Sequence, residues 1–428
     1  MYKIKKIITS SGERLPFFLN KEGMPVYDVT IYLLCELRAR NLSSNAIMNV
    51  LAAIKILYLY LYTQQYDLVE LIRNEKIVSM EVIESLSQFS KRKTSDIITS
   101  FSEKKGEDKY KIFSLEKRRK RETVDNLRSV HSSVSVIRLI YIKKFIYSFM
   151  TRVINNTQFE SVKRKKLIEL RDNFSVAIDS RIPSIGRRIF MNGRVGLSEN
   201  DAKEFLRVIS PASEDNPWNN EYVKVRNELM LLLLYHLGVR RGEILSIRTL
   251  DVLFQEGTLT VHRSADDPKD PRIDQPVQKT GSRKLPLNED MLQKIQTYIQ
   301  DWRSQGRLAH KNLFLFTTEN GTPLSISAFT KIFKVLRIKC PQLPRDLFAH
   351  ILRHTWNTRL SELADTNNMA EHEEIKIRSY LMGWSGTSGT AALYTKRHIE
   401  KKANSASLKM QENLDPIGGS DEANIPSK

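Results

Sequence analysis

The sequence predicts a mainly α-helical protein with a small antiparallel β-sheet, arranged as two domains. Apolar residues recur at helical spacing through most of residues 26–155 and 196–402. Alternation typical of a strand occurs at 257–263, and residues 278–287 have the composition of a hairpin turn returning into a second strand. Residues 180–193, with a proline, two glycines and Arg187-Arg188, have the composition of a linker. We therefore expect two domains joined near this segment.

The first domain is expected to be entirely helical. Residues 1–24 are predicted to form a short extended N-terminal arm, and residues 25–158 to form the helical domain. The apolar spacing predicts its helices at residues 26–40, 43–61, 79–89 and 134–155. Ser43 is placed to cap the second of these helices.

The second domain is expected to be of mixed α and β type. A basic linker, residues 159–195, in which Lys163 to Lys166 are predicted to start another basic helix, leads into it, and the domain spans residues 196–408. Its helices are predicted at 198–209, 222–237, 239–248, 289–303, 327–338, around His350, and at 375–402. An Asp- and Pro-rich excursion, Ser264 to Pro276, precedes the hairpin turn. The polar tail, residues 409–428, is expected to be disordered.

Composition narrows the class of protein. The chain holds 68 Lys and Arg against 49 Asp and Glu, a net charge of +19, which favours nucleic acid or an anionic membrane surface as partner. The alternative is an ordinary soluble protein with solvated lysines. We see no apolar run of the roughly 18 residues that a membrane span requires, and no apolar core of a secretion signal. Only Cys35 and Cys340 occur, so a cytoplasmic protein without disulfides is expected.

A histidine and an arginine mark the most informative helix of the second domain. His350 and Arg353, three residues apart, share one face and can hold a single anion from adjacent sides. Zinc at Cys340, His350 and His354 was the alternative, since a His pair at this spacing is permitted. No CxxC motif accompanies the pair, and Arg353 would repel a cation, so no metal is expected.

Five stretches of the second domain occur together in one order. They are Gly238 to Glu243, the lysine hairpin at Lys279, His350 to His354, Leu381 to Trp384, and Leu393 to Thr395. In this order and at these separations the sequence resembles the tyrosine recombinase family, the phage integrases and their relatives. The resemblance covers about residues 195–400. More loosely, residues 25–155 resemble the family's helical, SAM-like core-binding domain, which would make the second domain the tyrosine-recombinase catalytic domain.

The resemblance implies a role for each matching residue. Arg240 and Arg353 would clamp the phosphate, with Arg241 the rival for the first position. Tyr394 would be the nucleophile, and His350 would bind the phosphate and take the tyrosine proton. Lys279 would give a proton to the leaving 5′ oxygen, with Lys284 as its rival. Trp384 would stand where the family commonly has a histidine and would donate to the phosphate. Glu243 and His354 would support the site.

The resemblance also implies what the protein does. It would be a site-specific recombinase or integrase, cutting and rejoining DNA through a 3′-phosphotyrosyl intermediate for a mobile genetic element. It would need no cofactor and would act as a homo-tetramer on double-stranded DNA in the cytoplasm, associated with the nucleoid. An accessory DNA-bending or directionality protein would assist it. Basic residues are expected at the DNA backbone: Lys117, Arg118, Arg119, Lys120, Arg121, Arg187 and Arg188.

Two alternatives and two departures from the family pattern stay open. A topoisomerase of type IB would use the same chemistry, and a non-catalytic regulator would keep the fold without it. The segment from Trp384 to Tyr394 is one residue longer than the family spacing, with Gly386 and Gly389 between them. The excursion at Ser264 to Pro276 is also longer, and it could contact DNA, another protomer or nothing.

Overall fold

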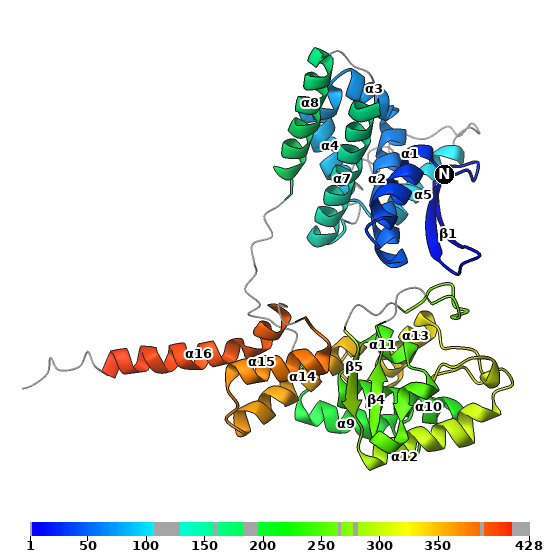
Figure 1. Ribbon diagram of the computed structural model, residues 1–428, viewed down its shortest axis with the longest axis vertical. Helices are drawn as coiled ribbons and strands as arrows, with labels where there is room; N and C mark the ends of the chain where they lie inside the picture. The colour runs from blue at the N-terminus through cyan, green and yellow to red at the C-terminus, as the bar shows by residue number, and fades with distance from the viewer. Residues whose placement is uncertain are drawn as a thin grey trace, which may run out of the picture. The chain divides into compact units, whose positions relative to one another are not determined.

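The computed structural model describes residues 2–106, 129–156, 161–182, 196–263, 267–276, 281–385 and 389–412. The chain divides into two compact units, Met1–Met191 and Asn192–Lys428. Helices dominate both units, and each unit holds one small antiparallel sheet (Figure 1). The predicted fold class, mainly α with a small antiparallel sheet, is confirmed.

The first unit begins with a β-hairpin where the sequence analysis expected an extended arm. Strand β1 (Lys3–Ile8) pairs with β2 (Arg14–Leu19), with Lys3 opposite Leu19. Leu15 and Phe18 of β2 are buried in the core of this unit. The hairpin forms because its second strand has apolar side chains to bury against the helices.

The helices of the first unit pack around α2. Its described elements are α1 (Tyr27–Tyr32), a π-helical turn (Leu33–Arg38), α2 (Ser44–Gln64), α3 (Leu68–Arg73), a 3₁₀ turn (Lys76–Val78), α4 (Met80–Ser90), α5 (Thr94–Gly106), α7 (Ser132–Asn156) and α8 (Ser161–Asp179). Ser43 caps α2 as predicted, because its side chain accepts from the backbone N–H of Ala46.

Helix α2 is also long and apolar enough to cross a membrane, the one such helix among the residues described. The sequence analysis did not expect any. In the structure, 56% of its most apolar window is buried within the unit. Helix α2 is therefore read as the core helix of this unit, in the middle of the cluster seen in Figure 1.

Helix α8 occupies residues that the sequence analysis assigned to the linker. Leu170, Phe174 and Ile178 are buried at helical spacing and complete the core of the first unit. The basic run at its start dominated the composition and concealed this stripe. The described residues of α8 therefore pack with the first unit, and the division of the chain at Met191 falls within the predicted junction at 180–193.

The second unit combines helices with a three-stranded sheet. Its described elements are α9 (Glu199–Ile209), α10 (Glu221–Leu237), α11 (Arg241–Ser246), β3 (Val252–Leu253), β4 (Thr258–Val261), β5 (Arg283–Pro286), α12 (Glu289–Thr297), a π-helical turn (Tyr298–Trp302), α13 (Ile326–Lys339), α14 (Ala349–Thr366), α15 (Glu371–Met382) and α16 (Gly389–Glu412). Four 3₁₀ turns lie among them, at Thr249–Asp251, Phe254–Glu256, Arg303–Gln305 and Ala309–Lys311.

The sheet and the helices of this unit share one apolar core. The strands lie in the order β3-β4-β5, all antiparallel, with Val261 opposite Arg283. Helix α10 is buried along most of its length and packs against α14. Helix α16 contacts α14 and α15 and continues to Glu412, past the predicted end of its pattern at 402. Residues 413–428 of the predicted tail lie outside the described residues.

Candidate active site

Helix α15 ends in a cluster of backbone carbonyls that several arginines share. The helix stops at Met382, and Gly383 follows with a left-handed backbone (φ +64°). The last carbonyls of any helix lack partners within the helix and carry partial negative charge. Here the carbonyls of Leu381, Met382 and Gly383 accept hydrogen bonds from other elements of the unit. This helix end therefore fixes the positions of the donors around it.

Arg353 on α14 is the most enclosed of these donors. Its side chain is buried (4% exposed). Nη1 donates to the carbonyl of Gly238 at 2.5 Å, and Nη2 donates to the carbonyl of Met382 at 3.2 Å. Because both carbonyls belong to helix ends, Arg353 links α14 to the C-termini of α10 and α15.

Arg240 reaches the same carbonyl from the start of α11. It follows Gly238, which ends α10 with a left-handed backbone (φ +60°). A Cβ at Gly238 would lie 2.9 Å from the side chains of Met382 and Trp356. Both the left-handed backbone and this lack of space therefore favour glycine at position 238. Nη1 of Arg240 donates to Met382 at 3.2 Å. The two guanidiniums predicted to form a clamp thus converge on one backbone oxygen.

Glu243 lies beneath this pair and is almost fully buried. Its carboxylate accepts from the backbone N–H of Arg240 at 2.8 Å and lies 3.5 Å from Nη1 of that residue. It also accepts two bonds from Arg283 on β5, at 2.8 and 3.2 Å. Both side chains of the Glu243–Arg283 pair are 1% exposed. Nε of Arg283 donates to the carbonyl of Leu381 at 2.7 Å.

The sequence analysis missed Arg283. It sits in a hairpin with two other cationic residues, Lys279 and Lys284, and the family pattern drew attention to Lys279 instead. A signal was available, because Arg283 is at an inward-facing position of a strand whose alternate residue, Leu285, is apolar. An inward arginine in a strand needs a buried carboxylate, which Glu243 supplies.

Tyr394 on α16 lies against residues of α14 and of the α15 end. Its hydroxyl is in hydrogen-bond contact with Nδ1 of His354, at 2.8 Å. Its ring stacks on Trp384, with ring centroids 5.9 Å apart and an angle of 16° between the planes. The ring of His350 packs edge-on against His354, with centroids 4.4 Å apart. The phenol thus meets His354, which follows Arg353 directly in the chain.

Charges from three elements surround the phenol. Burial raises the pKa of the Tyr394 hydroxyl, and the positive charges of Arg353, Arg378 and Arg240 oppose that rise. Burial, and after it repulsion by Arg240, lower the pKa of Arg353 to about 9. Burial also lowers the pKa of Arg240. Such a crowding of cations favours an anion placed among them, and it favours ionisation of the phenol.

The lysine hairpin is described only in part. Lys279 lies outside the described residues. Two residues further on, the N–H of Gly281 donates to the carbonyl of Gly383 at 3.1 Å. Lys284, the rival candidate, donates to Glu256 at 2.7 Å, and both side chains of that pair are about half exposed. Residues 117–121 and 187–188, the predicted backbone-binding runs, also lie outside the described residues.

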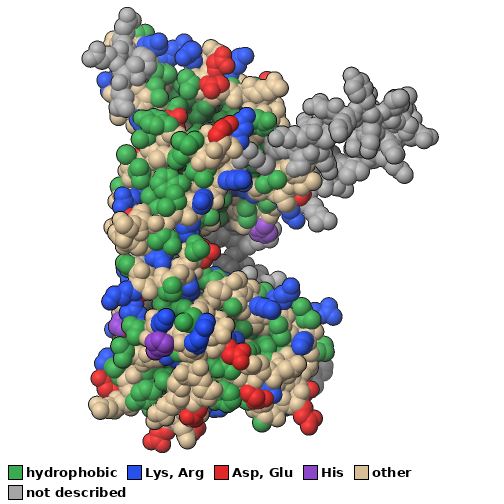
Figure 2. Space-filling view, turned by 90° about the vertical axis from the view of Figure 1, so that its right-hand side faces the viewer, with side chains coloured by type: hydrophobic (Ala, Val, Ile, Leu, Met, Phe, Trp, Pro, Cys, Tyr) green, Lys and Arg blue, Asp and Glu red, His purple; other side chains and the backbone are tan. Residues whose placement is uncertain are grey.

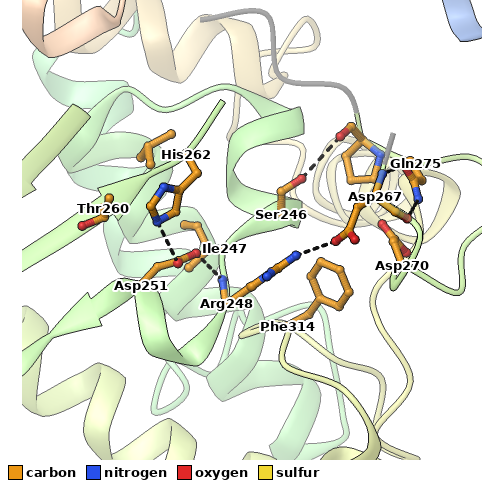
Figure 3. A pocket seen from close by; sticks show the side chains of 12 residues that line it. Ser246, Ile247, Arg248, Asp251, Thr260, His262, Asp267, Asp270, Gln275 and Phe314 are labelled. Atoms are coloured by element: carbon orange, nitrogen blue, oxygen red, sulfur yellow. Dashed lines mark hydrogen bonds and ion pairs between the residues drawn. The ribbon is translucent and has the colours of Figure 1, made fainter. Parts of the chain in front are cut away.

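The excursion that the sequence singled out folds back onto the second unit. Within its described part, 267–276, Arg272 pairs with Asp270 at 2.8 Å and donates to the carbonyls of Leu245 and Leu324. Asp267 pairs with Arg248 at 2.5 Å and borders a pocket of about 260 Å³ (Figure 3). The excursion is therefore anchored by buried polar contacts.

Within the described parts of the chain, no group of three or more His, Cys, Asp and Glu side chains could hold a metal ion. Cys340 is buried, and its Sγ contacts the carbonyl of Asp215 at 3.9 Å.

Comparison with known proteins agrees with the site. Residues 197–400 match the model of the phage integrase family. A XerC-like tyrosine recombinase of Caldanaerobacter subterraneus is 24% identical over 66% of this chain and 73% of its own length. XerD of Staphylococcus saprophyticus is 28% identical over 41% of this chain and 51% of its own length. XerA of Pyrococcus furiosus is 25% identical over 52% of this chain and 64% of its own length. The chain thus spans between half and two thirds of these last two relatives.

Solved structures give matches of the same class. The Tn1549 transposon integrase in complex with a circular intermediate DNA is 19% identical, with a TM-score of 0.38, covering 68% of this chain and 94% of that one. XerA recombinase is 20% identical, with a TM-score of 0.34, covering 61% of this chain and 82% of that one.

The matched span contains both arginines and the tyrosine described above, so residues 197–400 carry a phage integrase family domain. The matches support a site-specific recombinase or integrase, which is a DNA strand transferase. Neither a topoisomerase nor a non-catalytic regulator is favoured by these matches.

Proposed function

We propose that this chain cuts and rejoins double-stranded DNA at specific sites through a 3′-phosphotyrosyl intermediate, and that it serves a mobile genetic element. One observation carries the proposal: the hydroxyl of Tyr394 is held 2.8 Å from His354, the residue next to Arg353, in the same unit as Arg240. A nucleophile and an anion clamp therefore lie in one folded unit.

In this proposal Arg240 and Arg353 bind the non-bridging oxygens of the scissile phosphate. Their guanidiniums are already converged by their shared contact with the Met382 carbonyl. Arg241, the rival for Arg240, is the first residue of α11. A preorganised pair needs little reorganisation as negative charge grows at the phosphorus.

The attack transfers one proton from the phenol and one to the leaving group. The Tyr394 oxygen forms a bond to phosphorus as its proton passes to Nδ1 of His354, and the bond from phosphorus to the 5′ oxygen breaks. That oxygen takes a proton from Lys279. In the return step the 5′ hydroxyl attacks the phosphotyrosyl ester, the same protons move back, and no external energy is consumed.

The supporting residues follow from their contacts. Glu243 with Arg283 holds Arg240 in place, and His350, packed on His354, contacts the phosphate from the exposed side of α14. Trp384 stacks on the nucleophile, and its indole N–H can donate to a phosphate oxygen but cannot accept a proton. Proton acceptance therefore falls to the histidines.

The partners follow from charge and from the reaction. Lys and Arg side chains are spread over both units on the face drawn in Figure 2, and the net charge is +19. DNA is the polymer that such a charge attracts. In this proposal the basic runs 117–121 and 187–188 also contact the DNA backbone. Exchange between two sites requires four strands, so we infer a homo-tetramer on DNA, in the cytoplasm and on the nucleoid, assisted by an accessory DNA-bending protein.

The proposal is tested with the full chain and duplexes selected for binding from a random pool, then nicked to trap the cleaved strand. Wild-type protein should form a covalent adduct, whereas Tyr394→Phe should bind the same duplex and form none. Tyr380→Phe is the matched control, because Tyr380 lies on α15 of the same unit and is 60% exposed. An adduct that survives in Tyr394→Phe would refute the nucleophile assignment.

The two candidate lysines are separated by the same assay. We expect Lys279→Ala to slow cleavage by about 10²- to 10⁴-fold, the usual contribution of a positioned general acid. Lys284→Ala should cleave like wild type, because its ammonium is engaged by Glu256 at the surface. A duplex whose 5′ leaving oxygen is replaced by sulfur needs no protonation and should restore cleavage in the Lys279 variant alone.

A further inference from the structure

A buried ion pair lies behind the candidate nucleophile. Arg378 and Glu374 on α15 stand one helical turn apart and pair with each other, and both side chains are 0% exposed. A charge removed from water is costly unless it is paired and hydrogen-bonded. An apolar pair of equal volume would pack as well without this cost, so packing alone does not explain why the charges are buried here.

Arg378 is held by α14 as well as by its own helix. Nη1 donates to the carbonyl of Asn357 at 2.9 Å and to its Oδ1 at 2.8 Å. Nη2 donates to Oγ of Ser361 at 2.8 Å and to the carboxylate of Glu374. These contacts fix the plane and the position of the guanidinium. A group fixed in this way can in turn fix whatever packs on it.

Tyr394 is what packs on it. The guanidinium carbon of Arg378 lies 5.1 Å from the centre of the Tyr394 ring, within the range of a cation–π contact. The ring also stacks on Trp384, and its hydroxyl meets His354. Three side chains from α14, α15 and the loop after α15 thus hold one phenol on α16.

We propose that Arg378 is a positioning residue for Tyr394: its buried guanidinium holds the phenol ring in the site and stabilises the negative charge that the ring acquires when its proton leaves. This inference rests on the function proposed above, in which Tyr394 is the nucleophile. Glu374, Asn357 and Ser361 act through Arg378 by fixing its orientation. The sequence motifs of the second unit do not include any of these four residues.

The charges that face the phenol come from every element around it. They are Arg353 with His354 on α14, Arg378 on α15 and Arg240 at the start of α11. His350 lies behind His354. Arg240 and Arg353 are the residues that a bound phosphate would neutralise. The guanidinium of Arg378 is fixed by its own contacts with Glu374 and α14, 5.1 Å from the centre of the ring, so it stays beside the phenol whether or not a phosphate is bound.

The test replaces the ion pair by apolar side chains of similar size. The double variant Glu374→Leu/Arg378→Met keeps the volume and removes both charges, so it is expected to fold. Arg378→Lys keeps a charge but loses the planar fork. The matched control is Asp270→Leu/Arg272→Met, which removes another buried pair whose arginine lies 4.3 Å from the ring of Phe314. Thermal unfolding and DNA binding are measured for each variant.

The first readout is covalent adduct formation in a single turnover, as a function of pH. We expect the double variant to react about tenfold more slowly near neutral pH, the equivalent of one desolvated cation–π contact. The deficit should shrink as the pH rises, because alkaline solution deprotonates the phenol without help. Arg378→Lys should lie between the double variant and wild type, and the control should match wild type. A folded double variant with wild-type rates at every pH would overturn the proposal.

The second readout needs no DNA and no reaction. Tyrosines are replaced by 3-fluorotyrosine in the full chain, and the Tyr394 resonance is identified as the one that Tyr394→Phe lacks. Its titration by fluorine NMR should move to higher pH in the double variant and not in the control. An unchanged titration would overturn the role of Arg378 even if wild-type protein cleaves DNA. Absence of any adduct from wild-type protein, with the titration shifted, would refute the proposed function alone.

Discussion

The two units of this protein bury different chemistry. Among the described residues, the first unit is built on aliphatic and aromatic side chains, and Arg14 is its buried charged residue. The second unit has an apolar core of similar kind, yet it also buries a set of charged side chains: Arg226, Glu243, Asp270, Arg272, Arg283, Arg303, Arg353, Glu374 and Arg378. The core of the first unit is stabilised mainly by apolar packing, whereas that of the second also maintains costly buried charges.

The difference is concentrated where helices end. Arg353, Arg240 and Arg283 all donate to carbonyls at the C-termini of α10 or α15. Orphan carbonyls attract cations without requiring a carboxylate, so the positive charge of the clamp is kept. A carboxylate at the same place would neutralise the clamp that the reaction needs. Glu243 sits one layer further in, where it holds Arg283 at 2.8 Å and the backbone N–H of Arg240 at 2.8 Å, while the guanidinium of Arg240 lies further away, at 3.5 Å.

The largest expected effect is on the stability of the second unit. Glu243→Ala leaves the buried Arg283 without its carboxylate, and the free energy of unfolding of this unit should fall by roughly 3 to 5 kcal/mol. Glu256→Ala is the control, because its pair with Lys284 is about half exposed and such pairs contribute about 1 kcal/mol or less. Urea unfolding followed by tryptophan fluorescence measures both. Equal losses in the two variants would contradict the account of the buried pair.

The next effect is on catalysis. Arg353→Ala should lower the single-turnover rate of cleavage by about 10²- to 10³-fold, the usual consequence of removing one preorganised donor. Arg359→Ala is the matched control, since Arg359 is exposed on the same helix. Adduct formation on a nicked duplex at saturating protein gives both rates. A deficit that appears only at low protein concentration would assign Arg353 to binding instead.

A core truncation in the first unit should behave in the opposite way. Leu57 on α2 is 1% exposed, and Leu57→Ala should cost roughly 3 kcal/mol of stability through lost burial and the cavity left behind. The rate of cleavage by the bound, folded protein should not change, because none of the residues assigned above to the chemical step lies in this unit. Unfolding curves and single-turnover rates are compared at a temperature where the variant is folded. A slowed reaction would place part of the chemistry in the first unit.

The smallest expected effect comes from a simple anion. Burial and repulsion by Arg240 lower the pKa of Arg353 to about 9, below the ordinary value of arginine, so Arg353 stays charged at neutral pH but at a cost to the stability of the folded protein. That cost persists below pH 9 and is relieved as the pH rises from there toward the ordinary pKa. Sulfate between the guanidiniums should relieve it at neutral pH, adding about 1.4 kcal/mol at ten times its Kd.

Calorimetry with sulfate and with chloride of equal ionic strength measures this gain. Arg353→Gln should lose it, and Arg207→Gln, at an exposed site of the same unit, should keep it. Equal stabilisation of the Arg353 variant would show that sulfate acts elsewhere. The same experiment sharpens the contrast with the first unit, whose described core offers no comparable cluster of buried cations.

The sequence predicted the parts of the site that follow from local pattern. Gly238, Arg240, His350, Arg353, Trp384 and Tyr394 were named from motifs, and the structure gathers them in one unit. It did not predict that the phenol meets His354 instead of His350, because that depends on how α16 lies against α14. The roles of these residues, and of Lys279, remain predictions that the experiments above test.

Residues buried by tertiary contacts were the ones missed. Arg378 stands in a helix rich in Glu and Lys, which is typical of a solvated face, and its burial depends on α14 and α16 covering it. The basic helix starting at Lys163 was predicted, but its apolar stripe was missed because Lys163 to Lys166 outweigh it in composition. The N-terminal hairpin was missed because its alternation of apolar and polar residues is short. In each case burial depends on a packing partner outside the segment itself.

The most direct measurement identifies the residue that becomes bonded to DNA. The full-length protein is trapped on a nicked duplex, the adduct is digested with protease and nuclease, and the modified peptide is sequenced by mass spectrometry. The account predicts a nucleotide on the oxygen of Tyr394, joined through a 3′ phosphate. A nucleotide on any other side chain, or one joined through its 5′ phosphate, would contradict it.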